Sequence, residues 1–233
     1  HERDREIAML SRMPNFQSAP LGANWIGPYL DEIQRSFPNY SWIGVADAQG
    51  QVQASTGGLL KGADVRQRPW FSGGQQGPYV GDVHQAVMLE RLLPPQESSE
   101  PLRFLDFASP LRTSDGHVRG VIAAHVTLAW INEVIRSAQG GATQLNGSEV
   151  FILDGRGEIL HPYSAISAAL APFSLLVDEQ PYAVTQWGGT DRYYLTSALR
   201  VRSRTETDLG WRVVLRQPLA LALAPVEEAR QRL

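Results

Sequence analysis

The amino-acid sequence predicts an α+β fold with two antiparallel-sheet lobes, a long N-terminal helix and a C-terminal helix. Three observations lead to this prediction. The 233 residues suffice for one large domain or two small ones. A strand, an Asp-x-x-Gly turn and a return strand occur at 45–52 and again at 152–159. Each half then carries a second hairpin pattern, at 103–128 and at 192–217.

The N-terminal segment, residues 1–39, is expected to be mostly helical. It opens with the charged and then amphipathic stretch HERDREIAMLSRM, and prolines and glycines predict a break at 14–22. After the break, apolar residues recur at four-residue spacing, which predicts a helix that packs on a core. These residues are Trp25, Tyr29, Ile33 and Phe37.

The hairpin patterns divide the rest of the chain into a first lobe at 40–138 and a second lobe at 139–217. The stretch YSWIGVAD at 40–47 is expected to be the first strand. The last residues, 218–233, predict a further helix that continues beyond this sequence.

Composition excludes several classes of function. A hydrophobic content of 43% and a charged content of 19% are typical of a soluble globular protein. A net charge of −3 argues against nucleic-acid binding through a basic face. The absence of cysteine excludes disulfides, thiol catalysis and cysteine metal sites, and it suits an oxidising bacterial periplasm. No apolar run approaches roughly 18 residues, so we expect an excised soluble fragment without a membrane span or signal peptide.

The stretch at 62–84, GADVRQRPWFSGGQQGPYVGDVH, has a composition that a core strand would not need. Pro69 disfavours the α region for the residue before it, so Arg68 is expected to be extended. The side chains of Arg68 and Trp70 are then expected to project side by side, a planar cation next to an aromatic ring. The paired N–H donors of a guanidinium match the two oxygens of a carboxylate. This arrangement predicts one wall of a small-molecule pocket. A surface loop with a buried Trp70 and a solvated Arg68 is the alternative.

Two further residues of this stretch, Asp82 and His84, are separated by one position. Residues two apart in a strand face the same side, so they are expected to lie together. The two side chains could form a hydrogen-bonded pair, contact a ligand or supply two ligands of a metal site. The alternative is that they lie on an exposed polar face of the strand and have no such role.

Two polar residues lie in otherwise apolar strand patterns. His125 stands between Ala124 and Val126, where it is either a satisfied core histidine or a functional group. Asp106 stands in Phe104–Phe107 and needs partners if it is buried, which Arg68 or Arg103 are expected to supply.

Two motifs carry a resemblance to a known family. VRQRPWF with its glycine-rich loop and YVGDVH, and later RFLDFASPLRTSDGHVRGVIAAHV, are similar to the double Cache sensor family. These are extracytoplasmic ligand-binding domains of bacterial chemoreceptors, histidine kinases and diguanylate cyclases. The resemblance is good over 40–130 and extends to the rest through the hairpin pattern. It implies PAS-like lobes, with ligand bound in the membrane-distal lobe, a membrane-proximal second lobe, and a C-terminal helix that leads towards the membrane.

The resemblance also implies roles for single residues. In amino-acid-binding members, the Arg and Trp of Arg-x-Trp hold the ligand carboxylate, and Arg68 and Trp70 match them. A tyrosine and an aspartate two residues apart help to bind the amine. Their counterparts here are His84 and Ala86 by spacing, or Tyr79 and Gly81 by residue type.

A further family aspartate lies on the last long strand, where this chain has His125. Both carboxylates that would balance an ammonium are therefore missing. The resemblance thus predicts an anion, a carboxylate-bearing molecule or a neutral polar ring as the ligand, and not a simple α-amino acid.

We therefore predict the periplasmic sensor domain of a bacterial inner-membrane signalling protein, with a diguanylate cyclase or a histidine kinase as output. The resemblance also allows a homodimer. No enzymatic activity, catalytic residue, cofactor, metal or nucleic-acid partner is assigned to this chain. The expected ligand-binding residues are Arg68, Trp70, Tyr79, Asp82, His84, Asp106 and His125.

Three alternatives stay open. His84, Asp82 and His125 would suit a metal site. A structural or dimerising module would have an interior filled by side chains, without a pocket behind Trp70. A hydrolase is the weaker alternative, because the sequence has no GxSxG, HExxH, P-loop or dinucleotide fingerprint. The second lobe has no counterpart of Arg-x-Trp and is predicted to bind nothing by itself.

Overall fold

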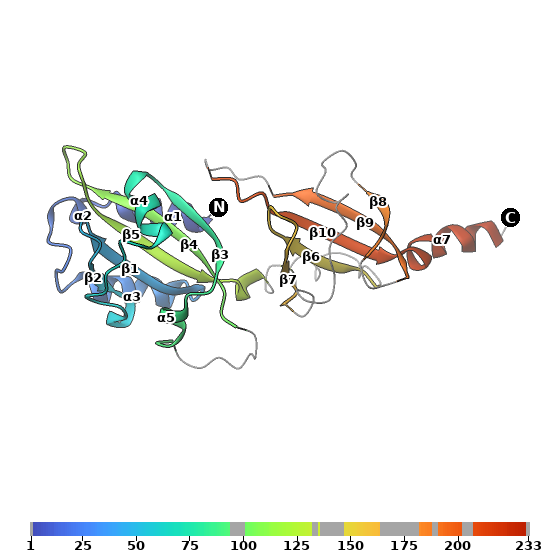
Figure 1. Cartoon of the computed structure of the whole chain (residues 1–233), viewed down its shortest axis with the longest axis horizontal. Coiled ribbons are helices and arrows are strands. Elements are labelled where there is room, and N and C mark those ends of the chain that lie inside the picture. The colour runs from blue at the N-terminus through green and yellow to red at the C-terminus, as the bar shows by residue number, and fades with distance from the viewer. Residues whose placement is uncertain are drawn as a thin grey trace. The chain divides into compact units, whose positions relative to one another are not determined.

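In a computed structural model the chain forms two compact units, His1–Asn132 and Glu133–Leu233 (Figure 1). The structure describes residues 2–93, 101–131, 135, 147–163, 182–187, 191–201 and 207–231. The expected lobe boundary at 138 and 139 lies outside the described residues. Among the described helices, none is long and apolar enough to cross a membrane.

The first unit is built on an antiparallel five-stranded sheet with the order β2-β1-β5-β4-β3 (Figure 1). Its strands are β1 (Tyr40–Asp47), β2 (Val52–Ser55), β3 (Tyr79–His84), β4 (Phe104–Arg112) and β5 (Val118–Thr127). The first strand and the hairpin at 103–128 are thus confirmed, because β4 and β5 pair antiparallel across a turn.

The N-terminal segment consists of separate helices in the described residues, not of one long helix. Among the helices of this unit are α1 (Glu2–Ser11), α2 (Pro14–Ser18), α3 (Ile26–Ser36), the 3-10 turn η1 (Thr56–Gly58), α4 (Pro69–Gln76) and α5 (Val87–Glu90). Pro14 stands in the first turn of α2, where its missing N–H leaves no helical hydrogen bond unmade. The expected break at 14–22 therefore contains a short helix.

The stretch after Arg68 is also a helix, α4, where the sequence suggests a glycine-rich loop. Pro69 opens the helix, and Gly73 and Gly74 lie inside it. A Cβ on Gly74 would lie 2.6 Å from a methyl group of Val121, so this glycine allows α4 to approach the sheet closely.

Both faces of the sheet are covered. Helices α1, α2 and α3 pack on one face, and α4 packs on the other. Ser11 of α1 and Ser109 of β4 share a hydrogen bond of 2.9 Å on one face. Ala108, the next residue of β4, lies under α4 on the opposite face. The face under α4 carries the cluster around Trp42 and Trp70, and it is the face from which the site is built.

The second unit repeats this topology. Its strands are β6 (Glu149–Leu153), β7 (Ile159–His161), β8 (Ala183–Gln186), β9 (Tyr193–Arg200) and β10 (Arg212–Pro218), followed by α7 (Leu219–Gln231). The order β7-β6-β10-β9-β8 corresponds to that of the first sheet, strand by strand. The α+β fold with two antiparallel-sheet lobes and a C-terminal helix is thus confirmed, while the edge strand β8 was not expected from the sequence.

The shared turn explains why the repeat is visible in the sequence. One carboxylate oxygen of Asp47 accepts the backbone N–H groups of Gln49 and Gln51, both at 3.0 Å. Asp154 accepts those of Arg156 and Glu158 in the same way, both at 2.8 Å. Each turn then ends on a glycine with positive φ, which an L side chain rarely adopts.

The packing of Trp42 yields a stability prediction. A Cβ on Gly44 would lie 2.1 Å from Cζ2 of the fully buried Trp42 ring, which has no space to move. Gly44→Ala should therefore lower the free energy of unfolding by about 1–3 kcal/mol through overpacking. Urea denaturation followed by tryptophan fluorescence measures the change.

The matched control is Gly77→Ala, because a Cβ on Gly77 meets no atom within 4 Å and its φ of 179° is ordinary extended backbone. Equal stabilities for the two variants would contradict the packing described for Trp42.

Candidate functional site

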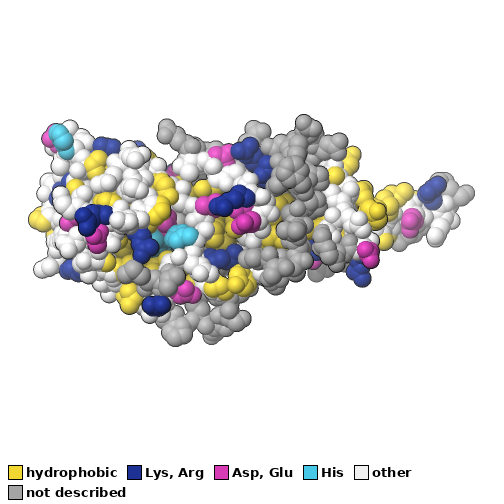
Figure 2. All heavy atoms as spheres, viewed as in Figure 1, with side chains coloured by type: hydrophobic (Ala, Val, Ile, Leu, Met, Phe, Trp, Pro, Cys, Tyr) yellow, Lys and Arg dark blue, Asp and Glu magenta, His cyan; other side chains and the backbone are white. Residues whose placement is uncertain are grey.

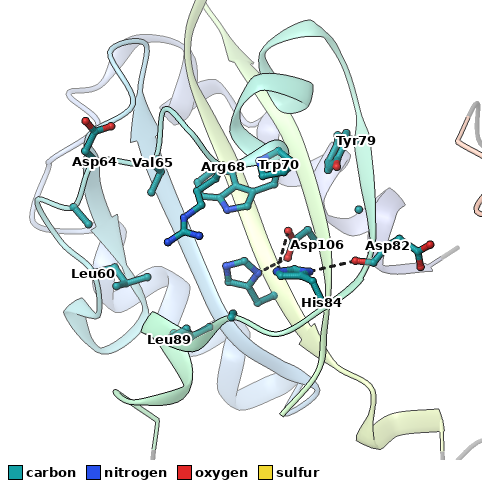
Figure 3. Close-up of a pocket in the computed structure, with 15 residues that line it drawn as sticks. Leu60, Asp64, Val65, Arg68, Trp70, Tyr79, Asp82, His84, Leu89 and Asp106 are labelled. Carbon is teal, nitrogen blue, oxygen red and sulfur yellow. Dashed lines mark hydrogen bonds and ion pairs between the residues drawn. The ribbon is translucent and has the colours of Figure 1, made fainter. Parts of the chain in front are cut away.

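A cavity of about 290 Å³ opens in the first unit on the face of the sheet under α4 (Figure 3). This volume is at the lower end of the range for small-molecule pockets. The lining residues are Leu60, Ala63, Asp64, Val65, Arg68, Pro69, Trp70, Tyr79, Gly81, Asp82, His84, Ala86, Leu89, Asp106 and His125. All seven residues that the sequence analysis selected are among them.

Arg68 and Trp70 take the positions that their sequence context predicts. Arg68 is extended, with φ −86° and ψ 131°, and it precedes the first residue of α4. The exposed Arg68 directs its guanidinium into the cavity, while Trp70 is only 3% exposed and forms part of the wall (Figure 3). The expected relation between a planar cation and an aromatic wall is therefore present.

The centre of the site is a buried carboxylate, Asp106. It lies on β4 directly opposite His125 on β5, and the two residues are only 4% and 5% exposed. Nδ1 of His125 is hydrogen-bonded to Oδ1 of Asp106. Nε2 of His84 lies 3.5 Å from the other carboxylate oxygen. The partners of Asp106 are thus two histidines, where the sequence suggested Arg68 or Arg103.

A β-bulge brings His84 to this site. Gly81 pairs with Asp106 and His84 pairs with Phe104, so β3 has one residue more than β4 between these pairs. The extra residue turns His84 to the face that Gly81 occupies. Without it, simple alternation would send His84 to the opposite face.

The bulge also corrects the expectation that Asp82 and His84 form a side-chain pair. The Asp82 carboxylate accepts the backbone N–H of Val83 at 2.7 Å and is directed away from His84 (Figure 3). The contact between the two residues instead runs from Nδ1 of His84 to the backbone oxygen of Asp82, at 3.2 Å.

Trp42 is the main contributor that the sequence analysis missed. Its ring lies 5.1 Å from that of His125 at an interplanar angle of 32°, and 6.0 Å from the ring of Trp70. Phe104 contacts His125 from another side, with ring centroids 5.9 Å apart. These aromatic neighbours fix the imidazole of His125 in place. No sequence signal marks Trp42, because its role depends on the pairing of β1 with β5.

The remaining charges lie towards the solvent. Asp64 forms an exposed ion pair with Arg66 at 2.6 Å, and hydrogen bonds from Arg66 lower the pKa of Asp64 to about 2. His84 keeps 39% of its side chain exposed. Figure 2 shows two groups of histidine atoms at the surface of this unit, one beside Asp or Glu atoms and the other beside Lys or Arg atoms. The histidine side of the cavity is therefore open to a solute.

The pKa of Tyr79 depends in part on the charge of Asp106. Burial raises the pKa of Tyr79, and the negative charges of Asp106 and Asp82 raise it further. Removing the charge with Asp106→Asn should lower the pKa of Tyr79, although it should stay above its ordinary value because burial, the largest cause, remains. A titration of ring-labelled tyrosines by NMR, assigned with Tyr79→Phe, measures this change.

The control for that titration is Asp115→Asn, which removes an exposed carboxylate from the turn between β4 and β5. The assignment of Tyr79 to the neighbourhood of Asp106 fails if both variants shift its pKa equally, or if neither does.

Comparison with solved structures finds the same fold in several receptors. The ligand binding domain of Mlp24 with asparagine has a TM-score of 0.65 at 16% identity, with 97% of this chain and 89% of that chain covered. The extracellular domain of the histidine kinase candidate rpHK1S-Z16 has a TM-score of 0.65 at 15% identity, with 95% and 88% covered. An extracellular ligand binding receptor from Desulfohalobium retbaense has a TM-score of 0.61 at 12% identity. In that case the alignment covers 92% of this chain but only 36% of the receptor chain.

A search of curated proteins finds no match to this chain. A family model described as Cache domain, however, matches residues 3–226, which is nearly the whole sequence. The resemblance drawn from the Arg-x-Trp stretch and the β4–β5 hairpin is thereby confirmed. The chain belongs to the Cache domain family, whose domains are extracellular ligand-binding sensor modules without a catalytic role.

Proposed function

We propose that this chain is the periplasmic sensor domain of a bacterial inner-membrane signalling protein, and that its first unit binds a small molecule with an anionic or strongly accepting group. The observation that carries the proposal is the direction of Arg68. Its guanidinium points into a cavity of metabolite size, beside the wall formed by Trp70 (Figure 3). A guanidinium in this position makes bidentate, charge-assisted hydrogen bonds to a carboxylate.

The carboxylates of the cavity support this choice of ligand. Asp64 is paired with Arg66. Asp82 is bound to the chain at Val83. Asp106 is bound to His125 and faces His84. Each carboxylate thus has a partner of its own.

The family positions that bind the ligand amine lead to the same conclusion. They hold His84 and Ala86, or Tyr79 and Gly81, and the position on the long strand holds His125. All five residues line the cavity. Although Mlp24 was solved with asparagine, we therefore propose that a simple α-amino acid is not the ligand of this chain.

The full protein would transmit binding through its second unit. We propose that the region 40–138 is the membrane-distal, ligand-binding lobe and that 139–217 is the membrane-proximal lobe. The helix α7 would lead towards the membrane and an output domain, for which a diguanylate cyclase or a histidine kinase is proposed. A homodimer would suit this arrangement. The coupling between ligand and output is limited by the difference in ligand affinity between the two signalling states.

A test begins with a thermal-shift screen of small carboxylates, other metabolites and L-amino acids, because a ligand that binds the folded state raises the melting temperature. For each hit, calorimetry compares the wild type with Arg68→Ala. Loss of a charged hydrogen-bond partner costs about 1.5–3 kcal/mol, so the affinity should fall roughly ten- to a hundredfold.

The matched control is Arg112→Ala, which removes an exposed arginine near the distant β4–β5 turn. It should leave the affinity unchanged, and neither variant should lower the melting temperature without ligand by much. Tight binding of several ordinary L-amino acids, or an unaltered affinity in Arg68→Ala, would overturn the proposed ligand class.

The second unit yields a separate prediction. It has no Arg-x-Trp element, and His161 at the end of β7 is its nearest polar candidate. Changing His161 to Ala should leave the affinity for every hit unchanged, as measured by the same calorimetry. A variant that keeps its circular dichroism spectrum but loses binding would place ligand contacts in the second unit.

A further inference from the structure

We propose that His84, Asp106 and His125 bind a divalent transition metal ion, with Zn²⁺ as the preferred ion, at the bottom of the cavity. One potential ligand atom from each residue lies within 4.8 Å of the others. Asp106 and His125 come from paired strands, and the bulge in β3 supplies His84. The inference rests on the proposed function in that it places the ion in the same pocket.

The contact between His84 and Asp106 has the spacing of two metal ligands. Nδ1 of His84 donates to the backbone oxygen of Asp82, and this directs Nε2 of the ring at the carboxylate of Asp106. The 3.5 Å between Nε2 and Oδ2 of Asp106 is long for a hydrogen bond. Two ligand atoms on one tetrahedral zinc, each about 2.0–2.1 Å from the ion, lie roughly 3.3–3.4 Å apart. The two atoms therefore have a separation at which one ion could bind both.

The surroundings hold the ligands as metal sites usually do. A metal-binding histidine commonly donates its other ring N–H to a carbonyl or carboxylate, and His84 does so to Asp82. The ring of His125 is fixed between Trp42 and Trp70. Binding of the ion replaces the hydrogen bond between Asp106 and His125 by two bonds to the metal, and the proton of that hydrogen bond is released to the solvent.

The donor set selects the kind of ion. Two imidazoles and one carboxylate suit zinc and neighbouring transition metals, whereas magnesium and calcium prefer oxygen ligands. Three protein ligands leave a fourth position, which is the arrangement of zinc sites that bind a water or an exogenous molecule. Because all three residues line the cavity, the fourth position opens into it.

The ion would also fit the anionic ligand proposed above. Asp106 neutralises one of the two charges of the metal, and the remaining positive charge adds to that of Arg68. The guanidinium of Arg68 and the two histidine rings lie around the same cavity (Figure 3). A carboxylate-bearing ligand would then bind the ion at one oxygen and Arg68 at another.

The experiment uses the whole chain, freed of metal with a chelator and without any organic ligand. Isothermal titration with Zn²⁺ alone should show one ion per chain, and Co²⁺ should give the visible absorption of a tetrahedral site. His84→Gln should weaken Zn²⁺ binding by about tenfold or more. His117→Gln is the matched control, because His117 also lies near a carboxylate, Asp115 at 2.9 Å, but in an exposed turn.

His84→Gln is the decisive variant because His84 is partly exposed, whereas Asp106→Asn and His125→Gln alter the core. Circular dichroism in the presence of chelator confirms its fold. The proposal is overturned if the wild type binds no Zn²⁺, or if His117→Gln loses as much affinity as His84→Gln. If the metal proposal fails in this way, the proposed function still stands provided that a carboxylate hit binds the wild type in the presence of chelator and that Arg68→Ala loses this binding. Conversely, Zn²⁺ binding without any anion binding would overturn the proposed function alone.

Discussion

The buried carboxylate of Asp106 is the constraint on which the pocket depends. A charged group 4% exposed in the middle of a sheet is costly unless neighbouring groups satisfy it. The hydrogen bond to Asp106 comes from His125 on the neighbouring strand, and a second imidazole, that of His84, faces the carboxylate only because of a bulge in β3. Because His125 is also enclosed by aromatic rings, the position of the charge is fixed before any solute enters.

The closed opposite face of the sheet decides where a pocket forms. Helices α1 to α3 pack on that face, and the cavity lies on the other side of the sheet, beside α4 and the turn after η1. Two glycines leave room for the side chains around the cavity. A Cβ on Gly81 would lie 3.1 Å from Cβ of Asp106 and would crowd the aspartate, while Gly44 makes room for the ring of Trp42. Leu60, which lines the cavity, has a positive φ of 62°, a conformation that costs a leucine about 1–2 kcal/mol. The pocket is therefore held open by backbone geometry as much as by polar groups.

Sequence reasoning was sufficient where the signal is local. Pro69 determines the backbone of Arg68, and Asp47 determines its turn through two hydrogen bonds to nearby N–H groups. The sequence did not predict the features that depend on the pairing between strands. The bulge after Gly81 and the register of Trp42 with His125 arise from the fit of distant segments, which a single sequence does not reveal. The helix α4 was missed because its glycines have low helix propensity, and tertiary packing on the sheet overrides that preference.

The second unit carries a different residue at the position that His125 takes in the first. Trp42 and Glu149 each lie five residues before the aspartate of the shared turn, and their partners on the neighbouring strand are His125 and Arg216. Arg216 therefore stands at the place of His125. Its guanidinium lies 4.5–4.6 Å from the ring centres of Phe151, Trp187 and Tyr194, and its Nε donates to Glu149 at 2.7 Å.

A cation of the chain itself thus occupies the aromatic cluster of the second unit, a favourable contact that needs no ligand. In the first unit the corresponding position carries a shorter imidazole beside a carboxylate, which leaves the volume that Arg216 would fill open to a solute. The exchange of one long cation for a histidine and an aspartate gives a physical reason to propose ligand binding in the first unit and a structural role for the second.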